Sequence, residues 1–306
     1  MDTEVQQMDG WNYALFSLEM TTNLLFIPVD FVLFYICIAQ KNLHINFRSA
    51  LFITAAGYFI CDIHRLILVP TRMCCIGLQN TVLVGQLFHM QNTGLNIILF
   101  GMVFVVIERA IASASTSTYE AQCKGYLVPS ILCGTVVILA ALITVITGFQ
   151  WIPDFDWYVM GVQILAVILC LVALIVIVSF NTSAYRRRHS VTVPLSDKYQ
   201  MDENIRVGRY LIPVALNDVV CQVIFISLIA YSLLFTDIPL GQDTSHLSHG
   251  YDLLLSYQRM FFGLALVLRS EKLDNLLNRS KRSTKVMGRQ AAAASNHFNE
   301  LREMWS

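Results

Sequence analysis

The chain alternates long hydrophobic runs with short polar segments, and seven of the runs are long enough to cross a membrane. A helix needs about 20 apolar residues to span the hydrocarbon core of a bilayer. Continuous apolar runs indicate helices, because the strands of a membrane β-barrel alternate apolar and polar positions. The expected helices cover residues 18–40, 49–70, 81–108, 126–148, 158–182, 210–235 and 247–269. The pattern therefore predicts an all-α membrane protein, a seven-transmembrane helix bundle.

Basic residues in the connections orient this bundle. Cytosolic loops are enriched in Lys and Arg relative to outer loops. One side of the membrane carries a single basic residue, Arg72, whereas the connections and C-terminal segment on the other side carry 17. We therefore expect the N-terminus outside the cell and the C-terminus in the cytosol, with the lipid bilayer around the bundle.

This orientation divides the chain into three parts. Residues 1–17 form an extracellular arm, residues 18–269 the seven-transmembrane bundle, and residues 270–306 a cytosolic tail. Leucines at positions 273, 276 and 277 share one face with basic residues around them, which is typical of a short amphipathic helix on the inner membrane surface.

Composition agrees with a membrane protein and excludes several functions. Charged residues make up 14% of the chain, against about 25% in soluble domains. The formal net charge is zero, so no attraction to nucleic acid is expected. Cys74 and Cys75 lie in an outer connection, and whether either forms a disulfide stays open. His246 and His249 have no third ligand nearby, so we expect no metal site and no cofactor.

Several charged residues fall inside the expected membrane helices. A charge near the bilayer centre costs about 2.5–3.5 kcal/mol on insertion scales, so it usually faces the bundle interior. Arg259 needs a carboxylate partner, and Asp218 or Asp30 lies at a similar depth. Such a pair either fixes helix packing or breaks on activation as a switch, and both readings stay open. Arg65 and Asp252 lie nearer the outer face, and we expect them to extend towards the surface.

The outer half of the third helix is unusually polar, with His89, Gln91, Asn92 and Asn96 as the candidate residues for binding a ligand. Polar side chains at this depth hydrogen-bond to other helices or line a cavity. Both interpretations remain, and the outer position of the run favours a ligand that enters from outside.

Two charged motifs lie on the cytosolic side. Glu108 and Arg109 end the third helix and form either an ordinary interfacial pair or an ionic switch. Arg186, Arg187 and Arg188 follow the fifth helix directly. These arginines serve as a stop-transfer anchor, with a contact surface for a cytosolic partner as the further reading.

Seven helices with Glu108 and Arg109 at the inner end of the third resemble a G protein-coupled receptor. The chain departs from the rhodopsin-like class, since its seventh helix lacks the Asn-Pro-x-x-Tyr pattern. Three stretches are instead similar to nematode serpentine chemoreceptors of the Sre (class epsilon) family. They are ERAIAS with Tyr119-Glu120 downstream, LSDKYQMDENIRVGRYLIP at 195–213, and the tail HFNELREMW.

The resemblance implies a chemosensory receptor in the plasma membrane of sensory-neuron cilia. Such a receptor binds a small-molecule chemical ligand and signals through a heterotrimeric G protein. The alternative is a transporter or channel subunit in which buried Asp and Arg residues form an ion path. An enzyme is not expected, because neither a metal cluster nor a nucleophile motif occurs in the sequence.

Overall fold

A computed structural model describes residues 10–39, 44–74, 82–115, 127–149, 151–152, 155–188, 195–236 and 246–268. Over these residues the protein is all-helical, and the seven-transmembrane bundle expected from the hydrophobic pattern is confirmed. The helices are α1 (Gly10–Ala39), α2 (Ile45–Cys74), α3 (Val82–Ala114), α5 (Leu127–Gly148), α6 (Phe155–Arg188), α7 (Leu195–Tyr231) and α8 (His246–Leu268). A π-helical turn, η2 (Ser232–Thr236), continues α7.

The helices extend beyond the apolar runs that predicted them. α1 begins at Gly10, inside the segment assigned to the N-terminal arm, and α7 begins at Leu195 rather than near residue 210. Hydropathy marks where a helix enters a bilayer, whereas the backbone hydrogen bonds continue into polar residues. The tail 270–306, with its expected amphipathic helix, and Cys75 lie outside the described residues.

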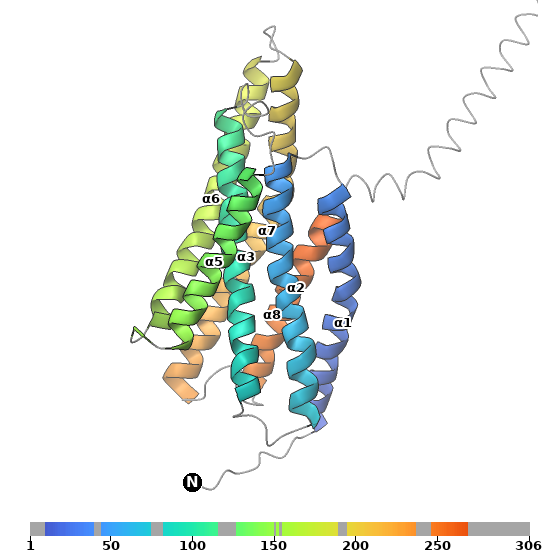
Figure 1. Ribbon diagram of the computed structural model, residues 1–306, viewed down its shortest axis with the longest axis vertical. Coiled ribbons are helices and arrows are strands. Elements are labelled where there is room, and N and C mark those ends of the chain that lie inside the picture. The colour runs from blue at the N-terminus through green and yellow to red at the C-terminus, as the bar shows by residue number, and fades with distance from the viewer. Residues whose placement is uncertain are drawn as a thin grey trace, which may run out of the picture.

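Successive helices run in alternating directions along the long axis of the bundle (Figure 1). α2 and α3 share the most extensive contact, and α1, α2, α3, α6, α7 and α8 close into a ring of neighbours. α5 packs outside this ring against α3 and α2. The interior of the ring is therefore bounded mainly by helices other than α5.

Apolar side chains cover the outward faces of the helices. Leu25, Ile138 and Val176 are 66%, 68% and 60% exposed, on α1, α5 and α6 respectively. A soluble protein rarely exposes such a continuous apolar surface, whereas lipid acyl chains accommodate it. Six of the described helices are long and apolar enough to cross a membrane, and α8, which carries Asp252 and Arg259, is the remaining one of the bundle. The chain is a multi-pass membrane protein.

Glycines bring α2 and α3 close together. A Cβ atom on Gly94 would lie 2.6 Å from the Cys61 sulfur and 3.0 Å from the Gly57 carbonyl oxygen. A Cβ atom on Gly101 would overlap the Thr54 hydroxyl and lie 3.2 Å from the Thr54 Cα. Small residues at such contacts let two membrane helices approach with their backbones in van der Waals contact. The seam fixes α3 against α2 and thereby positions the α3 side chains described below.

Replacing Gly101 with alanine is expected to lower the stability of the bundle by about 1–3 kcal/mol, because the added methyl group meets backbone as well as side-chain atoms. Thermal unfolding can be followed with a thiol-reactive dye, since Cys61, Cys170 and Cys221 are free and buried. Gly134→Ala on α5 is the matched control, because a Cβ atom there meets nothing within 4 Å. An equal melting temperature for the two variants would contradict the close packing of the seam.

α6 and α7 are longer than a membrane crossing requires, with 34 and 37 residues. About 20 residues suffice for the hydrocarbon core. Figure 1 shows the last turns of α6 and the first turns of α7 projecting past the other helices, at the end opposite to the start of α1. We refer to this as the α6–α7 end. It includes Arg188 and Leu195, where the two helices end and begin.

Candidate ligand cavity and switch

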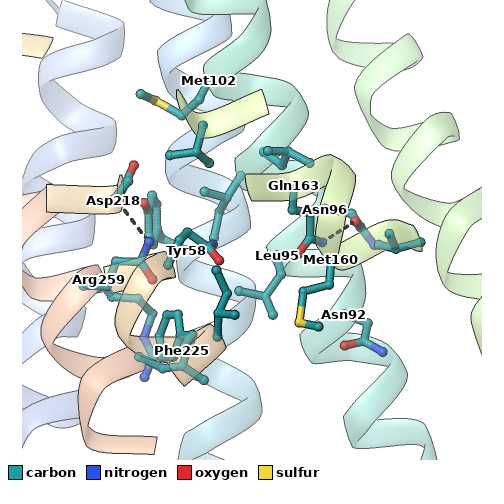
Figure 2. A pocket seen from close by; sticks show the side chains of 18 of the residues that line it. Tyr58, Asn92, Leu95, Asn96, Met102, Met160, Gln163, Asp218, Phe225 and Arg259 are labelled. Atoms are coloured by element: carbon teal, nitrogen blue, oxygen red, sulfur yellow. Dashed lines mark hydrogen bonds between the residues drawn. The ribbon is translucent and has the colours of Figure 1, made fainter. Parts of the chain in front are cut away.

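A cavity of about 610 Å³ lies inside the ring of helices (Figure 2). α3, α6, α7 and α8 supply most of its wall, Tyr58 adds a side chain from α2, and Thr147 and Gly148 close it from α5. Ligand pockets in proteins usually fall between about 300 and 1,000 Å³ and combine apolar walls with a few polar groups. The cavity therefore has the size of a site for a small organic molecule.

Three of the four candidate ligand residues line this cavity. His89, Asn92 and Asn96 are spaced so that they share one face of α3, and all three belong to the cavity wall. Gln91, the fourth candidate, is not among the residues that line the cavity. It is buried, and its backbone carbonyl oxygen accepts a hydrogen bond from the Cys61 sulfur on α2 at 3.8 Å. Neighbouring residues of a helix point about 100° apart, so Gln91 and Asn92 face different directions although both belong to the polar run.

Polar groups lie on two facing walls of the cavity. Figure 2 shows Asn92, Asn96 and Gln163 on one side, with the Gln163 amide donating to the Asn96 carbonyl oxygen at 3.4 Å. On the other side lie Tyr58 and Asp218, with the labelled Arg259 beside them. The wall between them is mainly apolar. It includes Leu95, Met102, Met160 and Phe225.

The ion pair expected between Arg259 and Asp218 is not formed, and the structure corrects it. Arg259 Nε lies 2.6 Å from Asp62 Oδ1 on α2, and Nη2 donates to Asn23 Oδ1 on α1 at 2.9 Å. Asp218 Oδ1 instead accepts a hydrogen bond from the Gln258 amide at 3.0 Å. Equal depth in the membrane made Asp218 a candidate partner, but the guanidinium of Arg259 is directed towards α1 and α2.

A second buried group of charges ties α1, α2 and α8 together. Arg65 lies 2.5 Å from Glu19 and 2.7 Å from Asp252, and Arg72 lies 3.6 Å from the same oxygen of Asp252. Arg65 and Asp252 are 1% and 2% exposed, so the expectation that they reach the surface is wrong. Glu19 was not among the charged residues singled out from the sequence, although it also lies within an apolar run.

His249, where no metal site was expected, contacts α1. Its Nε2 lies 3.0 Å from Asn12 Oδ1 on α1, and its ring meets Phe16 edge-on with centroids 4.5 Å apart. Among the described residues, no three His, Cys, Asp or Glu side chains are arranged to hold a metal ion.

Arg109 is the centre of a polar cluster towards the α6–α7 end, which we call the Arg109 latch. Its Nε and Nη2 lie 2.5 and 2.7 Å from the two carboxylate oxygens of Glu108. Its Nη1 donates to Asn204 Oδ1 on α7 at 3.0 Å, and its guanidinium stacks 4.4 Å from the ring centre of Phe47 on α2. Arg109 is 1% exposed, so these contacts replace water. The latch joins α3 to α7.

Ser113 extends the Arg109 latch to α6. The Asn204 amide donates to the Ser113 hydroxyl oxygen at 3.2 Å, and the Asn181 amide donates to the same oxygen at 2.7 Å. The three residues come from α7, α3 and α6. The sequence singled out Glu108 and Arg109 but gave no signal for Asn181 or Asn204, because single amides within helices are common.

The arginines proposed as a contact for a cytosolic partner form the last turn of α6. Arg186 is exposed, and the side chains of Arg187 and Arg188 lie outside the described part of the structure. Their backbone places all three at the α6–α7 end, the same end as the Arg109 latch.

Comparison with known families gives one result. A family model described as Sre G protein-coupled chemoreceptor matches residues 22–295 of the 306 in the chain. The matched range begins within α1 and includes all the other described helices. No curated protein matches the chain.

Proposed function

The chain belongs to the Sre family of G protein-coupled chemoreceptors, and from this premise we propose that it binds a small molecule in the cavity and activates a heterotrimeric G protein. One observation carries the proposal. The helices α3, α6 and α7 line the cavity with Asn96, Gln163 and Asp218, and the same three helices meet again in the Arg109 latch. A ligand that shifts these helices in the cavity therefore also shifts the latch.

We further propose that the α6–α7 end faces the cytosol and the start of α1 faces outside. The 17 basic residues counted on one side of the sequence support this orientation. Arg186, Arg187 and Arg188 then lie where a G protein approaches, and the cavity lies in the half that a ligand reaches from outside. The family supports residence in the plasma membrane, with sensory-neuron cilia as the proposed site.

The proposed mechanism is a shift between two helix packings. In the packing described here, Glu108 and Asn204 hold Arg109 in the bundle interior. A ligand that binds the other packing more tightly increases its population, and only this difference in affinity drives the change. In that packing Arg109 leaves its partners, and the ends of α3, α6 and α7 separate to admit the G protein.

The family favours a receptor over the alternative of a transporter or channel subunit. The two functions also differ in a measurement. A receptor reconstituted in nanodiscs with purified G protein accelerates nucleotide exchange when a ligand is added, whereas a transporter moves ions or substrate across sealed vesicles. Ligand-dependent flux without any nucleotide exchange would overturn the receptor proposal.

Filling the cavity tests where the ligand binds. Replacing Val167 on α6 with tryptophan is expected to raise the ligand concentration for half-maximal nucleotide exchange at least about 10-fold. Val167 lines the cavity, so the larger indole ring would take up space that the ligand needs. Val172→Trp is the matched control, since Val172 is 51% exposed on the outward face of the same helix. A ligand response that is equal in the two variants would show that the ligand binds elsewhere.

A further inference from the structure

The buried charges of the bundle do not balance. Among the described residues, six acidic side chains and four arginines are buried. The acids are Glu19, Asp30, Asp62, Glu108, Asp218 and Asp252, and the arginines are Arg65, Arg72, Arg109 and Arg259. A buried charge is costly unless an opposite charge or several hydrogen bonds compensate it.

Four of the six carboxylates form an ion pair with an arginine. Glu19 and Asp252 contact Arg65, and Glu108 contacts Arg109. Asp62 contacts Arg259, and Asp30 lies beside Asp62 without an ion pair of its own among the described residues. Of the two remaining carboxylates in the described part of the chain, Asp218 belongs to the cavity wall and Asp30 does not. The one hydrogen bond that Asp218 accepts there is from the neutral amide of Gln258, to Oδ1.

The surroundings of Asp218 provide for a ligand. Asp218 is 6% exposed and belongs to the cavity wall. Tyr58, on the same wall in Figure 2, is 2% exposed, and its hydroxyl has no hydrogen-bond partner among the described residues. Phe225 and Tyr251 line the same region, and aromatic faces attract cations. An unpaired carboxylate, a tyrosine without a hydrogen-bond partner for its hydroxyl among the described residues and two further aromatic residues therefore belong to the wall of one cavity.

We propose that the ligand of this receptor is a small molecule with a protonated amine on an apolar body, and that Asp218 binds the amine. This inference rests on the proposed function, since it assigns the ligand class of the same cavity. The ammonium group supplies the missing positive charge and donates hydrogen bonds to the carboxylate of Asp218, with Tyr58 on the same wall of the cavity. The apolar wall around Leu95, Met160 and Phe225 accommodates the body of the molecule.

An anionic ligand fits the cavity less well, although Arg259 contributes to its wall. The Nε of Arg259 is engaged with Asp62, and Nη2 donates to both Asn23 and Ser256, at 2.9 and 3.0 Å. A carboxylate ligand would compete with Asp62 for this guanidinium and would lie near the unpaired charge of Asp218. Electrostatics therefore disfavours an acid and favours an amine.

The test compares ligands that differ in one functional group. The full-length receptor in nanodiscs is heated with tryptamine, tryptophol or indoleacetate, and in parallel with phenethylamine, phenethyl alcohol or phenylacetate. We expect each amine to raise the melting temperature more than its alcohol or its acid. Equal or greater stabilisation by the alcohols or the acids would overturn the inference, as would no stabilisation by either amine. The comparison uses the unaltered protein, so it does not depend on the folding of any variant.

Variants of Asp218 then locate the site. Asp218→Asn keeps the size of the side chain and its acceptor for Gln258 but removes the charge, so amine affinity is expected to fall at least about 10-fold. Asp218→Glu, which keeps the charge, is expected to retain most of the affinity. Asp202→Asn on the exposed part of α7 is the matched control. Unchanged amine affinity in Asp218→Asn would overturn the inference.

The melting assay contains no G protein, so it separates the two proposals. Stabilisation by amines without any nucleotide exchange would support the amine site and count against signalling. Nucleotide exchange driven by alcohols or acids alone would support the receptor function and overturn the amine site.

Discussion

Replacing Arg65 with methionine is expected to prevent the chain from reaching the cell surface in a folded state. Arg65 is 1% exposed and lies between Glu19 on α1 and Asp252 on α8. Its removal leaves two carboxylates buried, with Arg72 at 3.6 Å as the remaining cation beside Asp252. Breaking a buried ion pair by removing one partner costs about 3–5 kcal/mol, a large share of the stability of a typical domain. Surface labelling and the melting temperature in detergent measure the loss.

A combined variant shows whether Arg65→Met fails because two carboxylates lose their cation or because the side chain no longer fits its site. Arg65→Met together with Glu19→Gln and Asp252→Asn removes the whole charge group, so it is expected to recover most of the surface delivery. Arg186→Met, which removes an exposed arginine at the end of α6, is the control and should change stability by less than about 0.5 kcal/mol. Normal delivery of Arg65→Met alone would mean that this charge group does not hold α1 and α8 against α2.

Replacing Glu108 with glutamine is expected to raise ligand-independent signalling about 10-fold. Glu108 holds Arg109 through two contacts, at 2.5 and 2.7 Å, and the neutral amide can keep only one acceptor for them. Hydrogen bonds to charged groups contribute about 1.5–3 kcal/mol, and about 1.4 kcal/mol shifts a two-state population 10-fold. Nucleotide exchange by a purified G protein without added ligand is the measurement, at matched receptor concentration.

Two further variants, one at Arg109 and one at an exposed acid, complete the test of the Arg109 latch. Replacing Arg109 with alanine is expected to abolish signalling at normal surface levels, because the residue that leaves the latch is then missing. Asp202→Asn neutralises an exposed acid on α7 and should leave basal exchange unchanged. If Glu108→Gln and Arg109→Ala both signalled like the unaltered receptor, the Arg109 latch would be only a structural contact.

The positions of the helices followed from the sequence because the bilayer imposes one strong requirement. Each segment that crosses the hydrocarbon core must be apolar and about 20 residues long, and this pattern is visible without knowing the fold. The ends were less predictable. Residues 195–209 continue α7 as a helix although they are polar, because backbone hydrogen bonds and the contact with α6 hold them there.

The partners within the bundle could not be predicted, because hydropathy reports depth but not the direction in which a side chain points. Arg259 was expected to find a carboxylate, and it does, but Asp62 holds that position instead of Asp218. Gln91 lies within one turn of Asn92, yet only Asn92 belongs to the cavity wall. Both differences arise from rotation about the helix axis, which depends on how all the helices pack.

Pro213 divides α7 into two segments that can bend relative to each other. It lies inside the helix between Asn204 of the Arg109 latch and Asp218 of the cavity. A proline removes one backbone hydrogen bond and softens the helix at that turn. At 1.5 Å per residue the helical segment from Pro213 to Asn204 is about 13 Å long, so a bend of about 5° at Pro213 displaces Asn204 by roughly 1 Å. A displacement of this size away from Arg109 is enough to break the 3.0 Å hydrogen bond between Asn204 and Arg109. A small bend of α7 at Pro213 therefore suffices to release the Arg109 latch.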